Sequence, residues 1–341
     1  MTLDLESSEK GMQHNHLLEI VDLKTYFFTK RGAVKAVDGI SFTIDAGDVF
    51  GLVGESGCGK SVTALSILRL VPDPPGKIVS GQVIFEGEDL LQKSEEEMRS
   101  IRGAKISMIF QDPLTSLDPI VRVGEQIVEA IRTHTNMNPQ KAWEKAVKIL
   151  TEVGIPDAEI RAKQYPFQLS GGMRQRVMIA IALVTEPRLL IADEPTTNLD
   201  VTIQAQILTL LKEIKAKTQT SILFITHNLG IVAWLCNKLA VMYAGKIVEY
   251  GATKSVFSNP LHPYTTLLLK AVPRLDIKKE MLESIEGDVP DLVNPPSGCR
   301  FHPRCPYAKK ICSIIQPPMI EVEEGHYASC LIYDKEKWRS V

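Results

Sequence analysis

Long apolar runs are missing from this sequence of 341 residues. The longest clean one, at 177–184, has eight residues, whereas a membrane-spanning helix needs about 18. The first ten residues, MTLDLESSEK, are polar and acidic, so we expect no secretory signal there. We therefore expect a cytosolic chain that reaches a membrane only through partner subunits.

An excess of charge of one sign is missing as well. The 39 Lys and Arg residues oppose 41 Asp and Glu residues, for a net charge of −2. No broad basic surface for nucleic acid is therefore expected. Hydrophobic residues make up 44% of the chain, which at this length is enough for one large domain and a small one.

Cysteine is sparse until the C-terminal region. Cys58 and Cys236 stand alone, and the other four follow the spacing C-x5-C-x6-C-x17-C. These four are Cys299, Cys305, Cys312 and Cys330. In a reducing compartment such a cluster suggests a metal rather than disulfides. The residues permit zinc or an iron–sulfur cluster, and His302 or His326 could replace a cysteine on zinc.

The segment GESGCGKS at 54–61 is the most informative pattern in the chain. It reads G-x-x-x-x-G-K-S, follows an apolar strand and opens a helix, as a phosphate-binding loop requires. Its glycines let backbone N–H groups cradle phosphate oxygens. Lys60 can reach the β- and γ-phosphates, and the Ser61 hydroxyl can hold Mg²⁺. The predicted nucleotide contacts are Gly54, Glu55, Ser56, Gly57, Cys58, Gly59, Lys60, Ser61 and the following Val62.

A second apolar strand, at 189–192, runs into two carboxylates. A strand of this kind carries its acids to the carboxyl edge of a parallel sheet, beside the phosphate loop. Asp193 suits Mg²⁺ coordination, and Glu194 is placed to polarise an attacking water as general base. The structural alternative is a strand cap followed by a turn at Pro195, which the neighbouring phosphate loop disfavours.

A further glycine pair opens another helix. In LSGGMRQR at 169–176, Ser170 can cap the helix, and Gly171 and Gly172 allow an anion to approach its N-terminus. One chain hardly needs two phosphate cradles for one nucleotide. This second cradle therefore has to be explained by something other than the phosphate loop.

The order of these motifs resembles the nucleotide-binding subunits of ABC transporters, whose signature motif is LSGG. The resemblance covers about 17–272 and implies that two subunits bind head to tail, with Ser170 and Gly172 of one chain facing ATP held by Lys60 of the other. It further implies roles for four other residues. Gln111 would sense Mg²⁺ and the water, Asp200 would belong to the D-loop, His227 would bond the γ-phosphate, and Phe27 would stack on adenine, with Tyr26 and Phe28 as alternatives.

Three positions depart from the commonest family pattern. Asn198 stands where a small residue is usual, Asn228 where Asp is usual, and Cys58 where Ser is frequent. None of them removes a catalytic group, so we expect a competent site. The larger side chain of Asn198 leaves open how the two subunits of the dimer communicate.

The fold class that the resemblance implies is α/β: a P-loop NTPase cassette of the ABC type, with an antiparallel β subdomain. We place this cassette at 1–272, with a helical subdomain at about 112–175, and a small metal-binding extension at 273–341. Strands are predicted at 17–28, 36–44, 48–53, 82–85, 105–110, 189–192 and 221–226, with a hairpin turning at Ala244-Gly245. Alternating strands and helices imply a parallel sheet covered on both faces.

The C-terminal part narrows the resemblance. The segments NPLHPYTTLLLKAVP and GCRFHPRCPYA resemble the oligopeptide/dipeptide and nickel importer branch. Some members carry a [4Fe–4S] cluster on four such cysteines, which makes iron–sulfur the preferred metal and zinc the alternative. The branch implies ATP and Mg²⁺, two transmembrane permease subunits, a second ATP-binding subunit, an extracytoplasmic substrate-binding protein and a peripheral position on the cytoplasmic face of the membrane.

Three functional hypotheses follow. The first is an ATPase subunit of a peptide importer, or of an importer for nickel or another small solute. The second is a soluble ABC ATPase acting on DNA or ribosomes, which usually has coiled-coil inserts or two cassettes, whereas this chain shows one cassette and a modest helical insert. The third is a redox-regulated ATPase in which the cluster reports oxidation.

Overall fold

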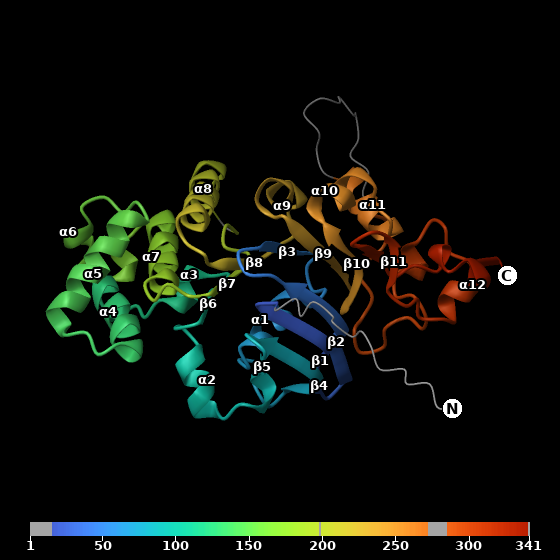
Figure 1. Ribbon diagram of the computed structural model, residues 1–341, viewed down its shortest axis with the longest axis horizontal. Coiled ribbons are helices and arrows are strands. Elements are labelled where there is room, and N and C mark those ends of the chain that lie inside the picture. Colours follow the sequence, from blue (N-terminus) through green and yellow to red (C-terminus); the bar gives the residue numbers. More distant parts are fainter. Residues whose placement is uncertain (1–15, 198, 272–284, 340–341) are drawn as a thin grey trace, which may run out of the picture.

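The computed structural model describes residues 16–197, 199–271 and 285–339 (Figure 1). Its centre is an eight-stranded sheet in the order β11-β12-β10-β9-β3-β8-β7-β6. The parallel strands are β6 (Ile106–Ile109), β7 (Leu189–Asp193), β8 (Ser221–Thr226), β3 (Val49–Val53) and β9 (Lys238–Tyr243). The antiparallel strands are β10 (Lys246–Ala252), β12 (His326–Ala328) and β11 (Ile320–Glu323).

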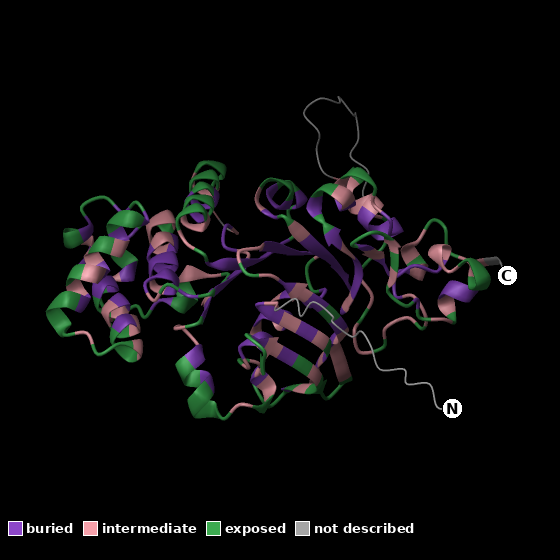
Figure 2. Ribbon diagram, in the orientation of Figure 1, coloured by how far each residue is buried: buried purple, intermediate pink, exposed green. Residues whose placement is uncertain are grey.

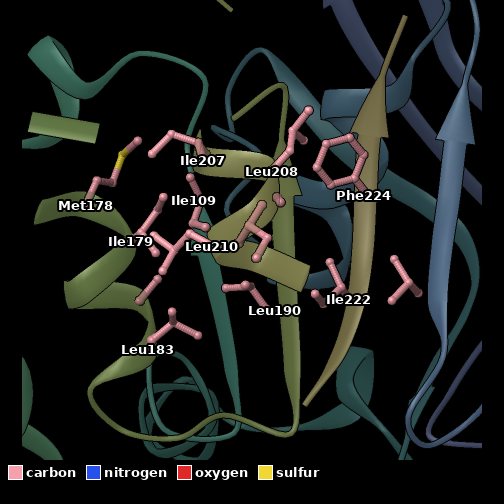
Figure 3. Packing of buried hydrophobic residues seen from close by; sticks show 14 of the residues in the cluster. Ile109, Met178, Ile179, Leu183, Leu190, Ile207, Leu208, Leu210, Ile222 and Phe224 are labelled. Carbon is pink, nitrogen blue, oxygen red and sulfur yellow. The ribbon is translucent and has the colours of Figure 1, made fainter. Parts of the chain in front are cut away.

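Both faces of the parallel strands are buried, so these strands are almost continuously apolar (Figure 2), whereas the edge strand β11 is partly exposed. In β8, Ile222 and Phe224 belong to one hydrophobic cluster, and the residues between and after them belong to another. Figure 3 shows the first cluster, in which helices α7 (Gly171–Leu183) and α8 (Val201–Lys217) pack on β6, β7 and β8. Helix α9 (Leu229–Leu235) contributes to the same cluster. The predicted parallel sheet is therefore present.

The other face packs against a four-stranded antiparallel sheet in the order β2-β1-β4-β5. Its strands are β1 (Leu18–Thr29), β2 (Gly32–Ile44), β4 (Gly76–Phe85) and β5 (Glu88–Asp89). Helix α1 (Lys60–Ile67) contacts β1, β2 and β7. Strand β4 starts earlier than the predicted 82–85, because residues 76–80 pair with β1 although they lack an alternating apolar pattern.

The helical region extends from one end of the main sheet (Figure 1). It contains α3 (Pro113–Ser116), α4 (Val123–His134), α5 (Pro139–Glu152), α6 (Ala158–Ala162) and the start of α7. The apolar positions Ile127, Ile131, Ala142, Ala146, Leu150 and Val153 of these helices are buried, and Ile149 is half-buried. The predicted subdomain limit near 175 lies inside α7, which continues onto the sheet. Helix α2 (Glu95–Ile101) precedes β6.

The C-terminal extension is not separate from the main sheet. Strand β12 pairs with β10 through Glu249↔Ala328 and Tyr250↔Tyr327, so it continues the sheet beyond the predicted hairpin. The proline-rich sequence did not reveal β11 or β12, because both are short, β12 depends on pairing with the distant β10, and β11 pairs in turn with β12. Helices α10 (Thr253–Ser258) and α11 (Pro263–Lys270) precede this part, and α12 (Lys335–Arg339) follows it. The predicted boundary near 273 lies outside the described residues.

No helix in the described ranges is long and apolar enough to cross a membrane.

Candidate functional site

The phosphate loop joins β3 to α1 and requires glycine at two positions. Gly54 and Gly59 have φ values of 157° and 108°. A Cβ on Gly54 would lie 2.1 Å from the Met242 carbonyl oxygen, and one on Gly59 would lie 2.1 Å from that of Ala36. The loop backbone is thus packed against neighbouring backbone on one side, which fixes the cradle before any ligand binds.

Lys60 lies inside this loop. Its side chain is buried at 4% exposure, and its Nζ donates hydrogen bonds to the carbonyl oxygens of Gly54 (2.8 Å) and Glu55 (2.9 Å). The ammonium is therefore held over the glycine loop by the loop itself. Cys58 is also buried there, and burial raises the pKa of its thiol, so it behaves as a small apolar residue.

Asp193 ends β7 beside the first turn of α1. The Ser61 hydroxyl donates a hydrogen bond of 3.1 Å to Asp193 Oδ1. Burial raises the pKa of the Asp193 carboxyl, and the neighbouring Glu194 charge raises it further. Hydroxyl and carboxylate oxygens are ligands that Mg²⁺ prefers. A divalent cation bound there would also offset the cost of burying the Asp193 charge.

Glu194 is the centre of a polar cluster at the same sheet edge. Its carboxylate accepts hydrogen bonds from Gln111 Nε2 (3.1 Å) and Thr197 Oγ1 (2.9 Å), and its Oε1 lies 3.2 Å from His227 Nδ1. Burial raises the pKa of Glu194, but the hydrogen bonds from His227 and Thr197 lower it more, so the pKa lies below its ordinary value. Its φ of 44° is unusual for a residue other than glycine, and such backbone clusters at functional sites.

Ser170 and Asp200 serve as helix caps within the chain. Ser170 Oγ accepts from the Met173 N–H (3.3 Å) at the start of α7, and Asp200 Oδ1 accepts from the Ile203 N–H (2.9 Å) at the start of α8. Gly171 and Gly172 form the first turn of α7. Over the described ranges, neither cap bonds to the phosphate loop or to the cluster around Glu194, and Asn198 lies outside those ranges. The structure therefore does not join the second cradle to the first within one chain.

The three aromatic candidates for adenine stacking lie at the end of β1. The Tyr26 hydroxyl donates a hydrogen bond of 2.5 Å to Asp38, and burial together with this bond raises its pKa to about 12. Phe27 is half-buried against Gly76, and Phe28 is 54% exposed. Tyr26 is thus engaged inside the chain, which leaves the two phenylalanine rings as candidates.

The four C-terminal cysteines line one small cavity of about 20 Å³, together with His262, His302 and Phe301. Burial raises the pKa of Cys299 to about 11 and that of Cys330 to about 12, and neighbouring thiols add to both shifts. No group of three or more His, Cys, Asp or Glu residues in the described ranges is arranged to hold a metal ion. The thiols converge on one cavity, but a bound metal would require them to rearrange.

The two histidines considered as zinc ligands differ in position. His302 lines the cavity, and its Nδ1 lies 2.9 Å from the Cys299 carbonyl oxygen. His326 is buried in β12 with its Nε2 2.8 Å from Glu249, and it does not line the cavity. His326 is therefore engaged elsewhere, and the prediction that it could replace a cysteine finds no support in this geometry.

Three residues at the site were not predicted from the sequence. Thr197 bonds to Glu194, Gln175 Nε2 donates to the Pro195 carbonyl (2.7 Å), and the Tyr264 hydroxyl accepts from the Glu55 N–H (3.0 Å). A hydroxyl three residues after Glu194 is a detectable local signal. No local pattern marks Gln175 or Tyr264, because their partners are distant in sequence.

Comparisons with known proteins agree with this geometry. The family described as "ABC transporter" matches residues 37–197, and "Oligopeptide/dipeptide transporter, C-terminal region" matches residues 248–312. The chain is 49% identical to "Dipeptide transport ATP-binding protein DppD" of Bacillus subtilis (strain 168) over 325 residues, which cover 95% of this chain and 97% of that one. It is 49% identical to "Oligopeptide transport ATP-binding protein OppD" of Escherichia coli (strain K12), with 93% and 94% covered.

Solved structures share the fold. The dimeric structure of MJ0796, a bacterial ABC transporter cassette, gives a TM-score of 0.63 at 24% identity and covers 69% of this chain and 98% of that chain. The structure of cbiO1 from Clostridium perfringens gives 0.61 at 27% identity, covering 72% and 92%. A phosphate loop beside the buried Asp193 and the adjoining, partly buried Glu194 in this fold defines a nucleotide hydrolase. The chain belongs to the ATP-binding subunits of ABC transporters and is an ATPase.

Proposed function

We propose that this ATPase powers the import of dipeptides or oligopeptides across a cell membrane. The observation that carries the proposal is the C-terminal region at 248–312, which matches the oligopeptide/dipeptide transporter family and packs directly on the cassette. The relatives named above are peptide-transport ATP-binding proteins, and this chain matches them over nearly their whole length. The chain would lie peripherally on the cytoplasmic face, bound to two transmembrane permease subunits that receive substrate from an extracytoplasmic binding protein.

The arrangement of side chains supports the following roles in hydrolysis. The glycine loop and Lys60 hold the phosphates of ATP, while Ser61, Asp193 and Gln111 would hold Mg²⁺, which neutralises charge on the phosphates when bound. Glu194 takes a proton from the attacking water, and its lowered pKa keeps it ionised at neutral pH. The bonds from Gln111, Thr197 and His227 orient that carboxylate. His227 would also bond the γ-phosphate when ATP is bound.

The second cradle supports a head-to-tail dimer with an identical or related ATP-binding subunit. Ser170, Gly171 and Gly172 form a helix N-terminus that, among the residues the structure describes, bonds to no part of the nucleotide site in its own chain. Helix N-termini with free N–H groups attract phosphate. The signature helix therefore serves ATP bound by the partner. Asp200 caps the next helix, whose Ile203 lies against Gly172 of the signature.

Reconstitution tests the proposed function. With both permease subunits in lipid vesicles, a peptide-loaded binding protein should raise ATP hydrolysis several-fold, and labelled peptide should accumulate inside. Stimulation by a nickel-loaded binding protein alone would favour the nickel alternative. A hydrolysis rate that does not change when the permease subunits are added would contradict an importer and favour a soluble ABC ATPase.

The proposed function includes a [4Fe–4S] cluster on Cys299, Cys305, Cys312 and Cys330. Four thiols lining one cavity are the donor set of such a cluster, and equally of zinc. The described cysteines are not arranged to hold a metal ion, so binding a cluster requires the thiols to rearrange. The cluster would act as a structural cross-link in a proline-rich segment that has little regular secondary structure.

Metal analysis decides this point. The chain purified without oxygen should contain four irons and four sulfides, and Cys312→Ser should lose most of both. Cys236→Ser is the matched control, because Cys236 is equally buried but lies at the end of α9, away from the cavity. Stoichiometric zinc without iron would favour the zinc alternative, and the absence of both metals would contradict a metal site.

A further inference from the structure

A short turn in the C-terminal extension reaches directly into the phosphate loop. Arg304 ends the 3₁₀ helix His302–Arg304, between two of the clustered cysteines. Its Nη1 lies 2.8 Å from Glu55 Oε2, and its Nη2 lies 3.1 Å from Glu55 Oε1. This is a bidentate ion pair, the stronger form of arginine–carboxylate contact. The arginine side chain is only 6% exposed and that of Glu55 27% exposed, so solvent screens the pair weakly.

The guanidinium of Arg304 is held from all sides. Besides its two bonds to Glu55, it donates to the Glu286 carbonyl (2.9 Å), the Ile285 carbonyl (3.3 Å) and the Tyr243 hydroxyl (3.3 Å). Its carbon Cζ also lies 5.8 Å from the centre of the Tyr243 ring. Arginine has five N–H donors, and these contacts provide five acceptors. The contacts other than Glu55 thus hold the Arg304 guanidinium in the orientation that a bidentate pair with Glu55 requires.

Glu55 in turn connects to the catalytic lysine. The Glu55 N–H donates to the Tyr264 hydroxyl (3.0 Å), and the Glu55 carbonyl accepts from Lys60 Nζ (2.9 Å). Residues from the C-terminal half of the chain therefore bind the side chain and the N–H of Glu55, while its carbonyl oxygen binds Lys60. Loss of the Arg304–Glu55 ion pair would therefore shift the Glu55 carbonyl oxygen that positions the Lys60 ammonium.

We propose that Arg304 is a positioning residue for ATP binding, which acts through Glu55 on the phosphate loop and Lys60. The inference rests on the ATPase activity and deepens the proposed function, because it joins the cysteine-bearing extension to the nucleotide site. Arg304 immediately precedes Cys305, so displacement of the turn that carries the cysteines displaces the arginine as well. The extension thereby contributes to the affinity of the cassette for ATP.

Arg300 provides a matched comparison in the same extension. It is also buried, at 7% exposure, and its guanidinium donates to the Ala244 carbonyl and to Asp38 of β2. Both arginines attach the extension to the cassette through an ion pair. Only the partner of Arg304 belongs to the phosphate loop. A purely structural role would therefore make the two residues equivalent, and a positioning role would separate them.

The experiment compares steady-state ATP hydrolysis by the full chain in the reconstituted transporter. Arg304→Met should raise the KM for ATP about tenfold, the factor that corresponds to about 1.4 kcal/mol, and should change kcat less than threefold. Arg304→Lys keeps the charge without the fork and should give an intermediate KM. Arg300→Met should leave KM within twofold of the wild type, although it weakens the attachment of the extension.

Two further variants keep the test decisive if Arg304→Met does not fold. Glu55→Gln breaks the ion pair from its more exposed end and should raise KM as Arg304→Met does, and the double variant should show no additional increase. Equal KM values for Arg304→Met and Arg300→Met, or additive effects in the double variant, would overturn the inference. A wild-type chain that peptide-loaded binding protein fails to stimulate would instead refute peptide import and leave this comparison intact.

Discussion

Replacing Glu194 with glutamine is expected to abolish most ATP hydrolysis while ATP still binds. The amide keeps the size of the side chain and can still contact Gln111 and Thr197, but it cannot take a proton from water. Loss of a positioned general base commonly lowers the rate by about 10²–10⁴-fold. Single-turnover hydrolysis measures the loss, and gel filtration with ATP should show the variant trapped as a dimer.

The control for this variant is Glu159→Gln on helix α6. Glu159 has the same side chain but is 74% exposed, lies in the helical region away from the sheet edge that carries Glu194, and pairs with Lys163 at 3.7 Å. Its substitution should leave turnover within about twofold, because exposed ion pairs contribute little. Turnover of Glu194→Gln equal to that of Glu159→Gln would eliminate the general-base role.

Replacing Lys60 with alanine is expected to weaken ATP binding and abolish hydrolysis. Hydrogen bonds from a charged donor contribute about 1.5–3 kcal/mol each, so the affinity should fall at least about tenfold. The loop offers no second cation, since its other residues are Gly, Glu, Ser and Cys. Fluorescent-nucleotide titration measures the affinity, and the matched control is Lys105→Ala, an exposed lysine paired with Glu86.

Mixed dimers extend this experiment to the partner chain. Lys60→Ala chains lack one cradle and Ser170→Arg chains lack the other, so neither variant alone forms a complete site. Mixing them should restore one composite site per dimer and a measurable part of the wild-type rate. Mixtures as inactive as each parent would contradict the head-to-tail arrangement, and wild-type ATP affinity in Lys60→Ala would show that the loop is not the phosphate site.

Local sequence identified the residues around the nucleotide because their chemistry depends on short spacings. The phosphate loop, the Asp193-Glu194 pair and the switch histidine His227 each follow a buried strand of the parallel sheet. The carboxyl ends of such strands meet at one edge, so the order of motifs predicts their proximity. The structure brings Gln111, Glu194 and His227 within hydrogen-bonding distance.

The sequence alone was weaker wherever a position depends on distant partners. Strand β12 has only three residues and forms by pairing with the edge of β10, and β11 forms by pairing with β12. Arg304 and Tyr264 grip Glu55 from 249 and 209 residues away, separations that no local periodicity records. The convergence of the cysteines could be predicted from their clustering, whereas the small volume of their cavity required the packed structure.

The sequence by itself therefore determined the class of this protein, its nucleotide chemistry and most strands of the cassette. These follow from glycine spacing, from apolar periods and from carboxylates placed at strand ends, all of which act over a few residues. Only the tertiary structure decided that the C-terminal extension joins the main sheet and that its arginine holds the phosphate loop. Long-range strand pairing and buried ion pairs form when the core brings distant segments together, and the chain carries no local record of them.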